Sequence, residues 1–228
     1  MGFPLGASSN LQGQERPLRL GITLGDVTGV GPEVTAKAIR SLADASAAKT
    51  GAAPVEFVIY GDRGWWERTL HRLSARDHRV KESAPFSDTV RIRLESAGLP
   101  PLPDRLVCGD PAAARAAVHW LETAGRACLR GDLDALVTAP VHKGAIQRAG
   151  IPFVGQTEFL GALAGEPAPV MMLLGSDGAG RWLRVALVTV HVALREVPTR
   201  LSVARIVRTI ACAQEACAQL RLPRARVA

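Results

Sequence analysis

The sequence predicts an α/β fold, in which a mostly parallel sheet is covered by helices on both faces. Two observations predict it. Short apolar runs rich in β-branched residues alternate with segments of helical periodicity along most of the chain. Glycine and proline stand between these segments, where the chain must turn. Because a helix between two strands returns the chain to the same end of the sheet, neighbouring strands are expected to be parallel.

The predicted strands differ in how much of each is buried. LRLGITL at residues 18–24 is a continuous apolar run, as expected for a buried strand, whereas DTVRIRL at residues 88–94 alternates and predicts a half-exposed one. We expect the strands at 170–174 and 182–190 to pair across the turn GSDGAG, and the final RARVA to begin a further strand. The remaining predicted strands are residues 55–60 and 135–138.

Helix boundaries are marked by proline, glycine and polar residues. Pro32 suits the first turn of a helix that includes residues 34–43, and Pro111 and Gly131 bound a long alanine-rich helix over residues 111–130. The other predicted helices are residues 64–73, 142–149, 157–163 and 199–220, the last of them long and amphipathic.

The composition of the 228 residues, 47% hydrophobic and 21% charged, is that of a globular protein with a large core. No apolar run approaches the roughly 18 to 20 residues of a membrane span, and the chain does not start with a secretory signal. Residues 1–17 are polar and rich in glycine and serine, which predicts a flexible N-terminal tail before the folded part, residues 18–228.

Cysteine and charge restrict the partners. The four cysteines form no CxxC pair, so we expect small buried side chains in a reducing compartment and a cytoplasmic protein. The net charge is +7, but the arginines are scattered and aromatic residues make up only 4% of the chain. This pattern favours anionic small substrates, and we expect neither a nucleic-acid nor a membrane partner.

Two loops that follow predicted strands carry candidate binding residues. The turn GDVTGVGPE, residues 25–33, either presents backbone N–H groups to an anion or only needs small residues to turn tightly. Asp26 and Glu33 are either ligands or helix-end carboxylates. In TAPVHK, Thr138, His142 and Lys143 either contact a substrate or form a capped helix start.

Two further segments carry the remaining candidates. In GQTEF, Gln156 can hydrogen-bond a substrate but cannot transfer a proton, and Thr157 is also explained as a helix N-cap. His191 follows the apolar run VALVTV, which places an imidazole at the end of a predicted buried strand. One imidazole is too few to hold a catalytic metal, and no GxSxG or HExxH pattern is present.

Four segments in order, GITLGDVTGVGPE, LVTAPVHKGAIQRAGIPFVGQTEFL, VMMLL and VALVTVHVALREV, resemble the 4-hydroxythreonine-4-phosphate dehydrogenase family of vitamin B6 biosynthesis. The resemblance spans residues 18–228. It implies a fold like that of isocitrate and isopropylmalate dehydrogenases, with two domains and a homodimer. It also implies oxidation of 4-phosphooxy-L-threonine with NAD or NADP, assisted by a divalent cation (Zn, Mg or Co), and decarboxylation to 3-amino-2-oxopropyl phosphate.

Residue by residue, the resemblance makes His191 a metal ligand and matches Gln156 and Thr157 to a substrate-binding His-Thr pair. Gln156 thus stands where the family has histidine. The two other metal histidines of the family lie in later motifs of the NPHAGEGG and YHDQG types, which are not in this sequence, so we expect a C-terminally incomplete member with impaired activity. Two alternatives remain: a dehydrogenase of another hydroxy acid or a dihydrodiol, and a non-catalytic subunit that binds a metabolite.

Overall fold

The computed structural model describes residues 16–47, 54–76, 90–166, 168–220 and 222. The chain forms two compact units, Met1–Gly165 and Glu166–Ala228. Most of the predicted N-terminal tail, residues 1–15, lies outside the described residues, as does the strand expected from the final RARVA.

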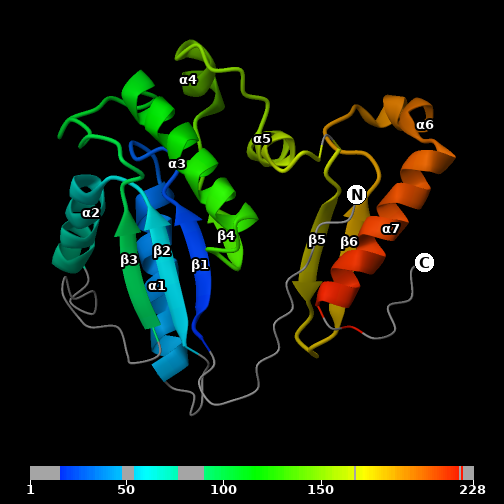
Figure 1. Ribbon diagram of the computed structural model, residues 1–228, viewed down its shortest axis with the longest axis horizontal. Coiled ribbons are helices and arrows are strands. Elements are labelled where there is room, and N and C mark those ends of the chain that lie inside the picture. Colours follow the sequence, from blue (N-terminus) through cyan, green and yellow to red (C-terminus); the bar gives the residue numbers. More distant parts are fainter. Residues whose placement is uncertain (1–15, 48–53, 77–89, 167, 221, 223–228) are drawn as a thin grey trace. The chain divides into compact units, whose positions relative to one another are not determined.

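The first unit contains a four-stranded parallel sheet (Figure 1). The strand order is β3-β2-β1-β4, so the first strand of the chain is central and β4 forms one edge. In register, Leu18 pairs with Val55 and Leu20 with Ala135. The strands are β1 (Leu18–Thr23), β2 (Val55–Tyr60), β3 (Val90–Glu95) and β4 (Ala135–Thr138). The predicted α/β fold with a parallel sheet is confirmed.

Helices cover both faces of this sheet. Figure 1 shows α3 (Pro111–Leu129) in front of the strands and α1 (Gly31–Ala47) behind them, and α1 packs beside α2 (Arg63–Arg76). The helix α3 begins where Asp110 accepts a hydrogen bond from the Ala112 N–H, and it turns its alanine-rich face and Trp120 into the core. Burial of each large apolar side chain contributes about 1.5 to 3 kcal/mol.

A smaller apolar cluster holds the segment after β4 against the outer side of α3. Its centre is Leu121, Ile146 and Phe153, all buried. Ile146 lies on α4 (Lys143–Arg148), and Phe153 packs against Phe159 of α5 (Gln156–Leu163) with 5.8 Å between ring centroids. The loop between α4 and α5 is therefore anchored by the buried Phe153 within it and by Ile146 in the helix before it.

Asp134 joins the start of β1 to the start of β4. Its carboxylate accepts hydrogen bonds from both terminal nitrogens of Arg16, at 2.6 and 2.9 Å, and from the Arg19 N–H at 2.8 Å. The Arg16 guanidinium holds the pKa of the Asp134 carboxyl below its ordinary value, since it stabilises the ionised form.

The second unit is a two-stranded antiparallel sheet followed by helices. The strands β5 (Met171–Ser176) and β6 (Trp182–Leu187) pair as expected. The expected strand end at 190 is wrong, because β6 stops at Leu187. The helical elements are a 3₁₀ turn (Leu194–Glu196), α6 (Val197–Arg200) and α7 (Val203–Gln219).

The predicted single helix over residues 199–220 is also wrong at its start. Leu201 and Ser202 are extended, with Ser202 at φ −148° and ψ 154°, and they separate α6 from α7. The Ser202 hydroxyl accepts a hydrogen bond from the Arg205 N–H at 3.3 Å, so the serine starts a new helix in place of continuing one.

Other expectations concern cysteine burial and membranes. Cys217 is buried, and Cys128 and Cys212 are half-buried, but Cys108 is exposed, so the expectation of four buried thiols is wrong for that residue. Burial raises the pKa of the Cys128 thiol. Within the described residues, no helix combines the length and apolar character that a membrane crossing requires.

Candidate functional site

The carboxyl ends of β1 and β4 define the candidate site of the first unit. From β1 the neighbouring strands are β2 on one side and β4 on the other, and the helices that precede these two strands, α1 and α3, cover opposite faces. The strand order thus reverses between β1 and β4. In open α/β sheets, ligands bind in the crevice at such a switch point, outside the carboxyl ends of the strands.

The loops that leave β1 and β4 are joined by backbone contacts. The Ala139 N–H donates to the Thr23 carbonyl and the Asp26 N–H to the Pro140 carbonyl, each at 3.0 Å. Gly25 has φ +65°, and a Cβ atom there would stand 2.2 Å from the Pro140 oxygen. Only glycine fits this position, because a side chain would meet both a left-handed backbone and a carbonyl in contact.

Asp26 organises the turn after β1. It is buried, and its Oδ1 accepts hydrogen bonds from the Thr28 N–H at 2.9 Å and the Thr28 hydroxyl at 2.6 Å. The Gly29 N–H donates to the Asp26 carbonyl, so three N–H groups of the turn, those of Asp26, Thr28 and Gly29, already have partners. Of the two interpretations of this segment, these contacts favour the tight turn over an anion cradle. Glu33 pairs with Lys37 at 2.6 Å on the exposed face of α1.

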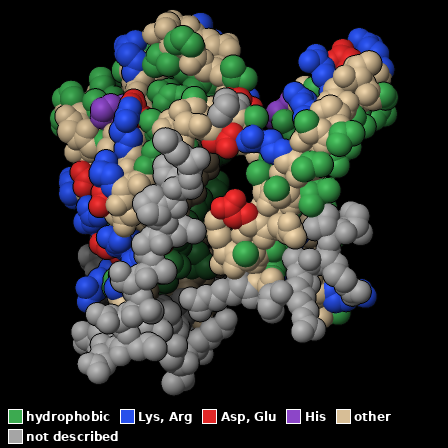
Figure 2. All heavy atoms as spheres, turned by 45° about the vertical axis from the view of Figure 1, so that its right-hand side comes forward, with side chains coloured by type: hydrophobic (Ala, Val, Ile, Leu, Met, Phe, Trp, Pro, Cys, Tyr) green, Lys and Arg blue, Asp and Glu red, His purple; other side chains and the backbone are tan. Residues whose placement is uncertain are grey.

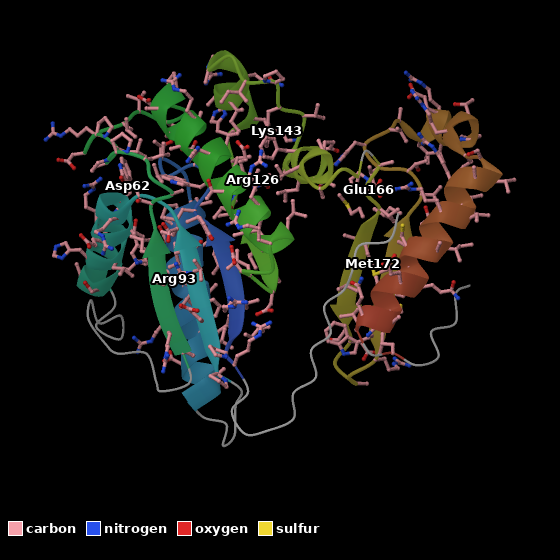
Figure 3. The ribbon with its side chains drawn as sticks, viewed as in Figure 1. Asp62, Arg93, Arg126, Lys143, Glu166 and Met172 are labelled. Carbon is pink, nitrogen blue, oxygen red and sulfur yellow. The ribbon has the colours of Figure 1, made fainter. Side chains whose placement is uncertain are left out.

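The loop after β4 leads into α4 through His142. The His142 Nδ1 accepts a hydrogen bond from the Ala145 N–H at 3.1 Å, as in the capped helix start. Lys143 is exposed, and its Nζ comes within 3.4 Å of the point where a Cβ on Gly155 would stand. Figure 3 labels Lys143 between α4 and α5. Lys143 makes no ion pair with any residue of the described ranges.

Gln156 and Thr157 open α5 beside these loops. The Gln156 Nε2 donates to the Ala139 carbonyl at 3.1 Å, which fixes the amide against the loop after β4 and leaves its Oε1 as an acceptor. The interpretation of Thr157 as an N-cap is wrong, because Gly155 is the N-cap and Thr157 is the second residue of the helix. The half-buried Thr157 hydroxyl is therefore not explained by capping.

His191 belongs to the second unit, whereas Gln156 and Thr157 belong to the first. It lies four residues beyond the end of β6, is exposed, and has φ +55°, an uncommon conformation for a residue with a side chain. The expected position at the end of a buried strand is wrong, since β6 is one of two largely exposed strands. Across the described residues, no three side chains of His, Cys, Asp or Glu come together as metal ligands do.

Thr28, Gly109 and Arg148 meet at the edge of the first unit, and their sequence does not mark them as neighbours. Gly109 donates its N–H to the Thr28 hydroxyl at 3.2 Å, and Arg148 and His142 lie against Gly109. Nothing in their local sequence distinguishes Gly109, Thr28 or Arg148, because the contacts join segments that lie far apart along the chain.

Comparison with known proteins identifies the family. The family described as Pyridoxal phosphate biosynthetic protein PdxA matches residues 53–228, which is well over half of the chain. The chain belongs to the PdxA family. The match includes α4, α5 and His191, and it does not include the turn at residues 25–33.

Relatives and solved structures agree with this assignment. The chain is 35% identical over 201 residues to a 4-hydroxythreonine-4-phosphate dehydrogenase of Geobacter metallireducens, covering 84% of this chain and 54% of that protein. A protein of the same name from Thioalkalivibrio sulfidiphilus is 35% identical over 179 residues, covering 78% of this chain and 50% of that protein. The crystal structure of 4-hydroxythreonine-4-phosphate dehydrogenase from Klebsiella pneumoniae matches with a TM-score of 0.68 and 27% identity, over 92% of this chain and 62% of that one.

The chain spans about half the length of the curated PdxA relatives that it matches. The relatives are named as dehydrogenases, so the family is one of oxidoreductases. The family match contains the part of the candidate site that follows β4, with Gln156 and Thr157, together with His191.

Proposed function

We propose that this chain supplies the substrate-binding half of a dehydrogenase that oxidises 4-phosphooxy-L-threonine with NAD or NADP. The β-keto acid formed loses carbon dioxide to give 3-amino-2-oxopropyl phosphate, a step of vitamin B6 biosynthesis. The observation that carries this proposal is membership of the PdxA family, with relatives named 4-hydroxythreonine-4-phosphate dehydrogenase. Because the chain spans about half of those relatives, we expect the 228 residues alone to have little or no activity.

Gln156 and Thr157 are the proposed substrate contacts of the chain itself. One N–H of the Gln156 Nε2 donates to the Ala139 carbonyl, and this leaves Oε1 to accept a hydrogen bond from a substrate hydroxyl or ammonium group and the second N–H to donate one. The Thr157 hydroxyl both donates and accepts. Neither residue moves a proton at neutral pH, so their contribution is to hold and orient the substrate.

The nicotinamide cofactor supplies the hydride acceptor when bound, and we assign no residue of this chain to it. We propose His191 as one ligand of a divalent cation. The residues described do not fit a complete metal site, since no group of three His, Cys, Asp or Glu side chains forms among them. The proposed ligand set therefore needs groups from outside the described part of this chain.

We also propose that the protein works as a homodimer in the cytoplasm. Support for a partner comes from α7, where Val203, Ile206, Val207 and Ile210 follow helical spacing and are between 39% and 79% exposed. Figure 2 shows hydrophobic side chains at the surface of this unit. An apolar stripe of this kind is stabilised when another protein surface covers it. The cytoplasmic location remains a prediction from cysteine usage.

Absorbance at 340 nm tests the dehydrogenase proposal. The chain is assayed with 4-phosphooxy-L-threonine, NAD or NADP and Zn²⁺, Mg²⁺ or Co²⁺, alone and mixed with a polypeptide that contains the C-terminal half of the Klebsiella pneumoniae relative. We expect little or no NADH or NADPH from the chain alone and a clear increase from the mixture. The His191→Ala variant in the same mixture is expected to lose metal-dependent activity.

Unphosphorylated hydroxy acids and dihydrodiols serve as competing substrates in the same assay. Strict dependence on the phosphate group supports the proposal, and equal or faster turnover of an unphosphorylated compound contradicts it. Full activity of the chain alone contradicts the expectation that the half is insufficient. The Gln156→Ala and Thr157→Val variants are expected to raise KM more than they lower kcat, since both residues hold the substrate.

A further inference from the structure

An arginine and a histidine at the edge of the first unit both lie close to the backbone of Gly109. The Arg148 Nη2 and the His142 Nε2 lie 3.1 and 3.2 Å from the point where a Cβ on Gly109 would stand. The Arg148 Nη1 and the His142 Cε1 each lie 3.4 Å from the corresponding point at Gly144. The guanidinium and the imidazole therefore lie beside each other along the backbone of two glycines.

Both groups present hydrogen-bond donors. The His142 Nδ1 accepts from the Ala145 N–H, so in the neutral ring the proton is on Nε2, the atom nearest Gly109. Arg148 carries a planar fork of N–H groups. Within the described parts of the chain, no ion pair or hydrogen bond uses the Arg148 guanidinium or the His142 Nε2.

Nearby carboxylates do not neutralise these donors. Asp110 is the residue after Gly109, and its Oδ1 accepts from the Ala112 N–H at the start of α3. Asp26 uses Oδ1 for Thr28. Neither carboxylate lies within 4.0 Å of an Arg148 nitrogen. Charge at this place is therefore left positive, as suits an anionic ligand.

Gly109 allows the two donors to approach its backbone and links them to the switch point. It has φ +72°, and any side chain there would stand within 3.2 Å of both donors. Its N–H donates to the Thr28 hydroxyl in the turn after β1. The two donors thus lie beside the loops that leave β1 and β4, where an open α/β sheet binds its ligands.

We propose that His142 and Arg148 form a binding subsite for a phosphoryl group, with the bare backbone of Gly109 as its floor. The planar guanidinium suits two phosphate oxygens, and the imidazole Nε2–H is a third donor at one side. The phosphoryl group belongs either to the phosphorylated substrate or to the pyrophosphate of the dinucleotide. Only this choice of ligand rests on the proposed function, since the geometry of the donors does not depend on it.

Calorimetric titration of the 228-residue chain with inorganic phosphate, at constant ionic strength, tests the subsite. We expect Arg148→Gln to weaken phosphate binding at least about tenfold, the loss of one charge-assisted hydrogen bond. His142→Asn keeps an acceptor for the Ala145 N–H but removes the Nε2 donor, so binding is expected to weaken while the thermal midpoint changes little. Arg126→Gln, which removes an equal charge on α3 where Arg126 pairs with Glu122, is the control.

Unchanged phosphate binding in Arg148→Gln overturns the proposal, and so does an equal loss in Arg126→Gln, which indicates a nonspecific charge effect. Competition with 4-phosphooxy-L-threonine and with ADP-ribose identifies the source of the phosphoryl group, because only one of them is expected to lose affinity in Arg148→Gln. Equal affinity of both compounds for the parent and the variant also overturns it. The titration does not depend on turnover. Phosphate binding that is lost in Arg148→Gln supports the subsite even if the dehydrogenase assay shows no activity.

Discussion

Replacing Gly25 with alanine tests whether the contact between the loops after β1 and β4 holds the site together. The new Cβ would stand 2.2 Å from the Pro140 oxygen and 2.8 Å from the Ala139 oxygen, at φ +65°. The left-handed backbone costs about 1 to 2 kcal/mol for a residue with a side chain. Displacing a packed carbonyl costs about 1 to 3 kcal/mol more. We therefore expect a loss of about 2 to 5 kcal/mol, a large part of the stability of a typical domain.

Urea unfolding followed by tryptophan fluorescence measures this loss, because Trp66 and Trp120 are buried in the first unit. Gly131→Ala is the matched control. Gly131 has φ +78° and nothing within 4 Å of its Cβ position, so only the backbone cost of about 1 to 2 kcal/mol is expected. If Gly25→Ala destabilises the protein no more than Gly131→Ala, the close approach of Pro140 is not a structural constraint and the reasoning is refuted.

Two further predictions concern the first unit. Ile146→Ala, at a side chain with no exposed surface, is expected to lower the free energy of unfolding by about 2 to 5 kcal/mol, whereas Val137→Ala, at a half-exposed position, changes it much less; equal losses in urea would contradict the role of the smaller cluster. The depressed pKa of Asp134 adds stability that is present above the unfolded pKa of about 3.9 and is lost as the pH falls through the lower folded value. In Asp134→Asn, the free energy of unfolding is therefore expected to fall less steeply as the pH drops below about 4. An unchanged dependence on pH would argue against the pairing with Arg16.

Most elements of the fold could be predicted because their signals are local. The apolar runs at β1 and β2 and the boundaries Pro111 and Gly131 of α3 depend only on neighbouring residues, and the structure agrees with them. Two predicted boundaries, the start of the last helix and the end of the strand at 182–190, differ from the structure although the hydrophobic pattern continues through both. Ser202 interrupts an apparently continuous amphipathic helix because its hydroxyl caps α7, and β6 ends before the apolar run does.

The site was less predictable because its contacts join distant segments. Side-chain chemistry made Gln156 and Thr157 candidates, but only the resemblance matched them to a substrate-binding pair. The hydrogen bond from Gln156 to Ala139 has no signature in the sequence. Nothing in the sequence singles out Arg148. Its guanidinium lies close to the backbone of Gly109, which is 39 positions earlier in the sequence. His191 remains a proposal, since one imidazole in an exposed left-handed turn does not define a metal centre.

The central position of β1 has a consequence for the order in which the protein can fold during synthesis. β1 leaves the ribosome well before β4, the neighbour on one of its sides, which lies about 115 residues later. At about 5 to 20 residues per second, one edge of the nascent β1 stays unpaired for roughly 6 to 23 seconds. A chain interrupted before Thr138 would display that edge permanently, so the last short strand of the sheet protects the first one from joining other nascent chains.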